Sequence, residues 1–293
     1  MAEVGLVLFA RTALEVMRDV LPDYSSKFSK HTFTQPQLMT ILCLMRFEDW
    51  TFREAEVRLL EHSDLRRALG LKKRVPDHTT LYRFMRRVTD EMLDQVLGAI
   101  SARLTPRGRG RKRKKAVVAV DATGLAPGSI STFYINRRTD RGEGLEWRHW
   151  CKWTIVVDVL RRCVLAQVAR QGPYNDCATL RPLVSAAHEI IPVGLVLADA
   201  EFDSERNHRH IRDVVGAESI IPAKRGKADW KIKGVRAQMR RRFPRRRYSQ
   251  RAQVESVFSV VKRKLSPKAP GRSDETQCRQ AMLLGLAYNI YLL

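Results

Sequence analysis

Apolar residues recur at helical spacing through residues 1–104. Thr51, followed by Glu54 three positions later, is typical of a capping box at the start of a helix. Pro76 and Asp77 precede a further stretch in which apolar and arginine side chains occupy opposite faces. The pattern therefore predicts an all-helical N-terminal domain over residues 1–104.

Two later apolar runs each lead into an aspartate. Residues 116–125, AVVAVDATGL, are rich in β-branched side chains and predict a buried central strand with Asp121 at its carboxyl end. Residues 193–202, VGLVLADAEF, predict a second buried strand that ends at Asp199. Between them, residues 151–170 are typical of an antiparallel hairpin.

The order of the remaining elements indicates the fold class. Helices are predicted over residues 175–190 and 204–215, and a short strand over 219–222. The order strand, hairpin, helix, strand, helix, strand, helix is that of a ribonuclease-H-like fold, in which helices flank a mixed five-stranded sheet. We therefore predict an α/β domain of this kind over residues 116–293, after the helical domain.

A last predicted helix, residues 248–265, is strongly amphipathic. Its side chains Tyr248, Arg251, Glu255 and Lys262 fall on one narrow face, because successive residues are rotated by about 100°. This row is either a set of surface ion pairs, each worth a few tenths of a kcal/mol, or a third carboxylate that joins the two aspartates. Asp121, taken alone, also has two interpretations. It either caps a turn or is a metal ligand, because a buried carboxylate needs a positive partner.

The net charge narrows the class of partner. The chain holds 54 Lys and Arg against 31 Asp and Glu, a formal net charge of +23, which favours a polyanion and by default nucleic acid. Residues 105–115, TPRGRGRKRKK, are predicted to be a basic linker that either follows a DNA backbone or remains solvated. The helices before it are either a helix-turn-helix module or a bundle with solvated arginines.

Other classes are disfavoured. No apolar run approaches the length of a membrane span, so no membrane partner is expected. The 5 cysteines are scattered without a Cys-x-x-Cys pair, which favours a reducing cytoplasm over a disulfide framework. The 7 histidines show no ligand-spaced pair, which argues against a zinc enzyme.

Taken together, these motifs resemble the DDE transposases of prokaryotic insertion sequences. The resemblance lies in Asp121 within VAVDATGL, in Asp199 within LADAEFDSE and in the Tyr-x2-Arg-x3-Glu-x6-Lys spacing of residues 248–262. Residues 69–84 are also similar to the part that precedes the catalytic domain in this group. One departure is Glu201, where the family often has glycine, so Glu201 or Asp203 is a candidate for an auxiliary role in the site.

The resemblance implies a reaction and a set of functional residues. Asp121, Asp199 and Glu255 would be the catalytic metal ligands for two Mg²⁺ ions, with Mn²⁺ as a substitute. The implied partner is double-stranded DNA, both element ends and target, bound by a homodimer that is nucleoid-associated in the cytoplasm. The candidate DNA-binding residues are Tyr248, Arg251, Lys262, Arg109, Arg111, Lys112, Arg113, Arg245 and Arg246.

Two other functions remain open from the sequence. A ribonuclease-H-like structure-specific nuclease or resolvase would use the same carboxylates, and only strand joining would separate it from a transposase. A catalytically silent DNA-binding relative would keep the basic surface without the reaction. Tyr248 either contacts a nucleotide or anchors the start of its helix.

Overall fold

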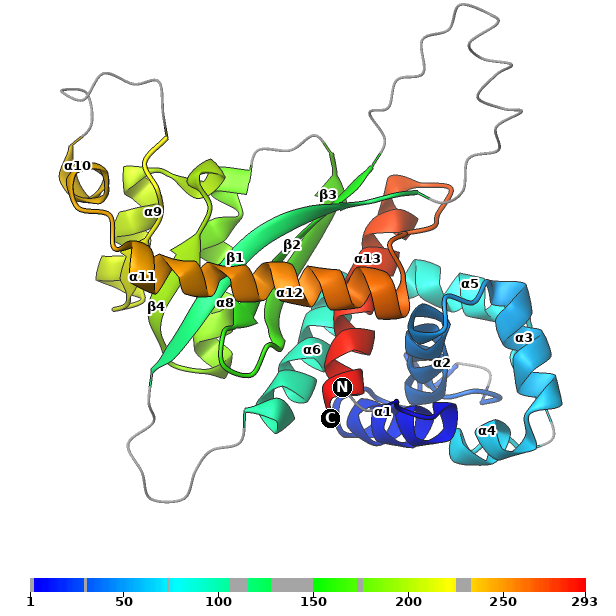
Figure 1. The fold of residues 1–293 in the computed structure, drawn as a ribbon. Coiled ribbons are helices and arrows are strands. Elements are labelled where there is room, and N and C mark those ends of the chain that lie inside the picture. Colours follow the sequence, from blue (N-terminus) through cyan, green and yellow to red (C-terminus); the bar gives the residue numbers. More distant parts are fainter. Residues whose placement is uncertain are drawn as a thin grey trace, which may run out of the picture.

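The protein is described here by a computed structural model, drawn in Figure 1, which covers residues 3–28, 31–72, 74–105, 115–127, 150–172, 176–224 and 233–293.

The described part of the N-terminal region is helical, as the sequence predicts. Thr34 and Thr51 each form a capping box, and the side chains of Asp77 and Thr89 cap the helices that follow them. These polar residues therefore fix where the chain enters each helix. The helices are α1 (Leu6–Val20), α2 (Gln35–Phe47), α3 (Phe52–Glu61), α4 (Ser63–Ala68), α5 (His78–Arg87) and α6 (Asp90–Leu104).

A mixed five-stranded sheet follows, with the order β3-β2-β1-β4-β5. Strand β1 pairs antiparallel with β2 and parallel with β4, so the sheet changes from antiparallel to parallel at its central strand. This arrangement confirms the predicted α/β class. The strands are β1 (Ala116–Leu125), β2 (Cys151–Asp158), β3 (Val164–Gln171), β4 (Val193–Ala198) and β5 (Glu218–Ile220).

Helices cover both faces of the sheet. Val118 and Val120 of β1 share a core with α8 (Leu180–Ile190), while Ala119 between them belongs to the core that includes α12 (Ala252–Val260) and α13 (Asp274–Leu292). The two cores alternate along β1 because successive side chains of a strand point to opposite faces.

The α13 helix connects the sheet with the N-terminal helices. It runs between these two parts of the molecule (Figure 1) and packs against α2, α6 and β3. Met39 of α2, Leu97 of α6 and Trp153 of β2 all belong to the same buried cluster as α13. Arg46 of α2 is 1% exposed and donates to the carbonyl oxygen of Lys268 over 2.7 Å. The N-terminal helices and the face of the sheet that α12 and α13 cover thus share one continuous core.

Two predicted helices are less regular than expected. Ser204 does cap the helix after β4, but α9 is short (Glu205–Arg209) and continues as a π-helical turn, His210–Val214. The predicted helix 248–265 is α12 preceded by a 3-10 turn, Ser249–Arg251, and followed by a π-helical turn, Val261–Leu265. Its apolar stripe is nevertheless buried, with Val254, Phe258, Val261 and Leu265 all in the core.

Two further short helices, α10 (Gly234–Arg241) and α11 (Arg245–Tyr248), lead into α12. In Figure 1, α10 lies beside α9 at one end of the molecule, and α11 continues into α12, which crosses the sheet over β1. None of the helices within the described ranges combines the length and apolar composition that a bilayer span requires.

Candidate active site

Asp121 and Asp199 lie next to each other, Asp121 on β1 and Asp199 directly after the adjacent parallel strand β4. The last paired residues of β1 and β4 are Val120 and Ala198, and each aspartate is the next residue of its chain. Both side chains point to the face that α12 covers, because Ala119 and Leu197, two positions earlier, belong to that core. The register therefore brings together two carboxylates that are far apart in sequence.

The prediction that Asp121 ends its strand is wrong. It lies inside β1, opposite Ile155 of β2, and the strand continues to Leu125. The antiparallel pairing with β2 sustains β1 beyond the point where β4 stops. Asp199, by contrast, does follow the last residue of its strand, and its Oδ1 accepts a hydrogen bond from the backbone N–H of Ala200 over 2.5 Å.

Arg251 connects the aspartates to the third predicted carboxylate. Its Nη1 lies 2.7 Å from Oδ2 of Asp121, and its Nη2 lies 2.5 Å from Oε1 of Glu255. The side chains of Arg251 and Asp121 are 17% and 20% exposed, whereas Glu255 is 56% exposed. The guanidinium is thus a largely enclosed positive charge shared between a strand and a helix, with Glu255 at its solvent side. The ring of Tyr248 flanks the same guanidinium at 5.8 Å from its centroid.

Several neighbouring groups shift the pKa of the Asp121 carboxyl, and they differ in direction. Burial raises the pKa of its carboxyl, and the nearby Asp199 carboxylate raises it further. The backbone N–H of Ala122 and the Arg251 guanidinium oppose this effect by stabilising the ionised form. Two adjacent and partly buried carboxylates need a positive charge nearby. Within the protein, the guanidinium of Arg251 supplies this charge.

Lys262 lies on the same side of the sheet, one step along β1. Its Nζ donates to Oγ1 of Thr123 over 2.6 Å, and burial lowers the pKa of its ammonium group. Thr123 was not among the predicted site residues. The available signal was its position two residues after Asp121, which places both side chains on one face of a strand.

The carboxylates do not form a closed cluster of three. Within the described ranges, no group of three or more His, Cys, Asp and Glu side chains is placed to hold a metal ion. Arg251 lies between Asp121 and Glu255, so the third carboxylate is linked to the aspartates through a cation. The donor set itself, three carboxylates and nothing softer, fits a hard divalent cation such as Mg²⁺.

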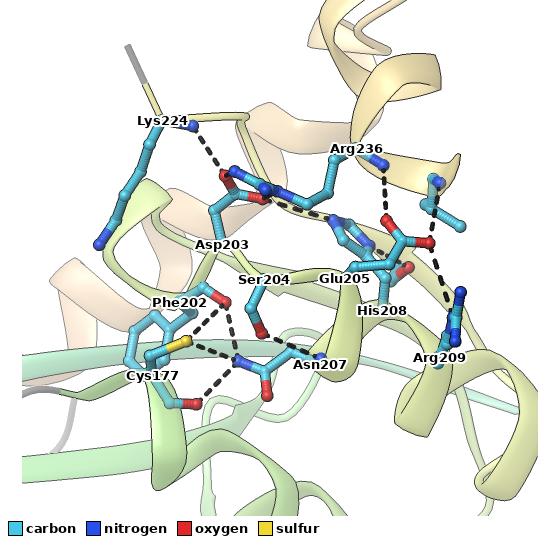
Figure 2. A network of polar contacts seen from close by, with 12 residues as sticks. Cys177, Phe202, Asp203, Ser204, Glu205, Asn207, His208, Arg209, Lys224 and Arg236 are labelled. Atoms are coloured by element: carbon cyan, nitrogen blue, oxygen red, sulfur yellow. Dashed lines mark hydrogen bonds and ion pairs between the residues drawn. The ribbon is translucent and has the colours of Figure 1, made fainter. Parts of the chain in front are cut away.

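Glu201 and Asp203, the two auxiliary candidates, make contacts away from this pair of aspartates. Glu201 is 65% exposed and lies 3.6 Å from Nζ of Lys152, which also pairs with the buried Asp176. Lys152 is on the opposite face of the sheet from its neighbour Trp153, which belongs to the α12 side. The side chain of Asp203 is buried, and both its oxygens accept hydrogen bonds from Arg236 (Figure 2).

The remaining predicted DNA contacts divide into two groups. Arg245 and Arg246 are exposed on α11, directly before the helix that bears Arg251 and Glu255. The predicted linker contacts lie outside the described residues; they are Arg109, Arg111, Lys112 and Arg113.

Comparison with known protein families identifies the family of this chain. Residues 112–290 match the family described as Transposase DDE domain, and residues 10–87 match a second family, Transposase domain (DUF772). No curated protein matches the chain. The first match spans the whole sheet, both aspartates and the helix with Glu255, which is well over half of the 293 residues. The chain therefore belongs to the DDE transposases of insertion-sequence type, whose catalytic domain has a ribonuclease-H-like fold.

Proposed function

We propose that this transposase cleaves phosphodiesters at the ends of its insertion sequence and transfers the freed 3′-hydroxyl to target DNA, with Asp121, Asp199 and Glu255 as the catalytic residues. The observation that carries this proposal is the register of β1 and β4, which sets Asp121 beside Asp199 on the face covered by α12. Arg251 links that pair to Glu255. These side chains come from a strand, a strand end and a helix, and no local turn or cap requires them to meet.

Two divalent cations, Mg²⁺ or in its place Mn²⁺, would be held by Asp121, Asp199 and Glu255. When bound, such ions supply charge stabilisation to the attacking and leaving oxygens of an in-line phosphoryl displacement. The protein contributes carboxylates of fixed position: Asp121 is held by the β1–β2 ladder, and Asp199 by the N–H of Ala200. The family resemblance assigns Asp121 as the ligand that both ions would share. In the structure it neighbours Asp199 through the register of β1 and β4, and Arg251 links it to Glu255.

The cationic residues of the site would bind the DNA strand. Arg251 donates through two nitrogens, a geometry that suits a phosphate as well as two carboxylates. Lys262, held against Thr123, would place a point charge on a neighbouring phosphate. Tyr248 packs edge-to-face against Phe243 with 4.8 Å between ring centroids, which favours its role as an anchor of the helix start.

The exposed arginines before the site would contact the DNA backbone. Arg245 and Arg246 lie directly before the helix of Arg251. The linker residues Arg109, Arg111, Lys112 and Arg113 would add further phosphate contacts. Double-stranded DNA is thus the proposed partner, as element end and as target. A homodimer acting in the cytoplasm on paired ends completes the proposal, because two ends require two sites.

The test is Asp121→Asn, which keeps the shape of the side chain and removes its charge. With labelled element ends and Mg²⁺, we expect cleavage and strand joining to fall at least about 1,000-fold, as for loss of a principal charge-stabilising group. Binding of the same DNA should persist. Asp213→Asn, an exposed aspartate away from the site, is the matched control and should retain both activities.

Two results would contradict the proposal. Unchanged cleavage by Asp121→Asn would remove the carboxylate assignment. Efficient cleavage by the unmodified protein without any joining to an unrelated plasmid would instead support the structure-specific nuclease.

A further inference from the structure

Asp203 is a buried carboxylate that the catalytic scheme does not use. Its Oδ1 accepts from Nε of Arg236 over 2.8 Å, and its Oδ2 accepts from Nη2 of Arg236 over 2.5 Å and from the backbone N–H of Lys224 over 2.9 Å. The side chain is 0% exposed, and that of Arg236 is 14% exposed. Such a two-nitrogen fork fixes orientation as well as distance, so Asp203 holds α10 in one position.

Glu205 makes a second attachment to the same helix. Its two carboxylate oxygens accept from the backbone N–H groups of Val235 and Arg236, at 3.2 and 3.4 Å, in the first turn of α10 (Figure 2). Gly234 permits this contact in two ways. It has φ of +65°, and a Cβ at this position would lie 2.1 Å from Oε1 of Glu205. Glycine at position 234 therefore leaves open the space that the carboxylate of Glu205 occupies.

The segment that carries these carboxylates is itself well fixed. Nδ2 of Asn207 donates to the carbonyl oxygens of Phe202 and Cys177, each over 2.8 Å (Figure 2). Asp203 is four residues after Asp199, on the segment that begins at the carboxyl end of β4. The residues that hold α10 thus lie on the same segment as Asp199, the second proposed catalytic aspartate.

The α10 helix depends on contacts with other elements for its stability. It has 8 residues, and Met239 is its one buried residue. No acidic residue occurs between residues 233 and 254, so neighbouring arginines repel each other without local compensation. An isolated helix of this length is not stable in water. The exposed arginines of α10 and of the residues that follow it are Arg240, Arg241, Arg242, Arg245, Arg246 and Arg247.

We propose that Asp203, Glu205 and Arg236 are positioning residues that hold the arginine arm, defined as residues 234–248, in place to bind DNA phosphates beside Asp199. The proposal rests on the proposed function for the identity of the DNA. It assigns to Asp203 a role through Arg236 and the arm, and not a role as a metal ligand. Because the arm leads directly into α12, the same attachment also sets the start of the helix that bears Glu255.

The experiment compares Asp203→Asn and Arg236→Lys with the unmodified full chain. Asp203→Asn removes the charge, while Arg236→Lys keeps the charge and removes the fork. We expect amide hydrogen exchange in residues 235–241 to accelerate about tenfold or more, because breaking a buried ion pair releases the element that it holds. The slope of log affinity for a labelled linear duplex against log salt concentration, measured without divalent metal, should fall by at least about one.

Glu218→Gln is the matched control. It breaks the exposed ion pair between Arg247 of the arm and Glu218 of β5, whose charged atoms lie 2.7 Å apart, and such pairs contribute little. In this control, neither the amide exchange of residues 235–241 nor the slope of log affinity against log salt concentration should change. Arg245→Ala combined with Arg246→Ala gives the reference for direct loss of phosphate contacts, with reduced slope and unchanged exchange in α10.

The proposal is overturned if α10 exchanges at the original rate in Arg236→Lys, or if its exchange rises while the salt slope stays the same. It is also overturned if exchange rises equally in α6 and α13, since that pattern means general destabilisation. Should Asp203→Asn fail to fold, Arg236→Lys decides the outcome. These measurements use no cleavage, so a failure of the catalytic assignment, tested with Asp121→Asn, is separate.

Discussion

Arg251 shows how far single residues can be predicted from sequence. The spacing of Tyr248, Arg251, Glu255 and Lys262 predicts a shared helix face, and the structure places Arg251 against both Asp121 and Glu255. The partners themselves could not be predicted, because they depend on how α12 crosses β1. The same holds for Thr123, which becomes relevant only once Lys262 is seen to reach it.

The separate role of Asp203 was likewise beyond the sequence. Spacing placed it near Asp199 and left a part in the metal site open. Only the position of Arg236, more than thirty residues later, shows which positive group it meets. A pattern of charges along a chain indicates which groups need partners, and tertiary packing selects them.

A buried histidine beside this pair predicts a pH dependence. His208 is 0% exposed, and burial lowers its pKa to about 4, although the Asp203 carboxylate opposes the shift. The unfolded chain binds the proton near its ordinary pKa of about 6.5. Stability from neutral His208 is therefore complete above about pH 6.5 and is lost as the pH falls toward 4.

We expect His208→Gln, which keeps a polar group for Ser219, to lose part of this dependence. Between pH 7 and pH 5 the free energy of unfolding of the unmodified protein should fall by about 2 kcal/mol more than that of the variant. Urea denaturation of both proteins at the two pH values measures the difference. Parallel pH profiles would contradict the buried neutral state.

At the scale of elements, strands and helix starts were predicted well and helix interiors less so. Apolar runs and capping residues are local signals, which is why β1, β4 and the start of α3 were found. The π-helical turns at His210–Val214 and Val261–Leu265 have no such signal, because they depend on packing. The extent of β1 beyond Asp121 depends in the same way on its pairing with β2.

Two helical glycines give opposite predictions for substitution by alanine. A Cβ at Gly285 of α13 would lie 2.1 Å from Oε1 of Gln167, a buried atom that accepts from Nε1 of Trp153 over 3.0 Å. Gly285→Ala should therefore destabilise the protein by about 1–3 kcal/mol through overpacking. A Cβ at Gly98 of α6 would meet nothing within 4 Å, so Gly98→Ala should stabilise it by up to about 1 kcal/mol.

Urea unfolding curves of these two variants provide the measurement, with each variant serving as the control for the other. Unchanged or increased stability of Gly285→Ala would contradict the described packing of α13 against β3. Loss of stability in Gly98→Ala would contradict the open space beside α6.

At the scale of the whole molecule, the predicted boundary after residue 104 does not coincide with a break in the core. Met39 of α2 and Leu284 of α13 belong to the same buried cluster as Ile155 of the sheet. Sequence order could not show this, since α13 comes last and yet packs against the first helices. The two predicted domains, one helical and one catalytic, therefore differ in composition and in their position along the chain, but no break in the buried core of the described residues separates them.

This shared core predicts cooperative unfolding. We expect far-ultraviolet circular dichroism, which follows the helices, and tryptophan fluorescence, which follows the surroundings of Trp153 and the other tryptophans, to report one coincident transition in urea. The helices cannot leave α13 without exposing the apolar surface that also covers the sheet. Two separate transitions, with part of the helical signal lost before the fluorescence change is complete, would show that the N-terminal helices unfold independently.

The position of Asp121 inside a long strand has a consequence for how the enzyme meets its substrate. Asp121 is held by a ladder that continues beyond it, Asp199 begins a turn, and Glu255 stands near solvent on a helix. Backbone contacts therefore fix Asp121 and Asp199, whereas the exposed Glu255 is the acidic group with freedom to move. A DNA strand that changes shape as it reacts would meet two fixed carboxylates and a third that can follow it.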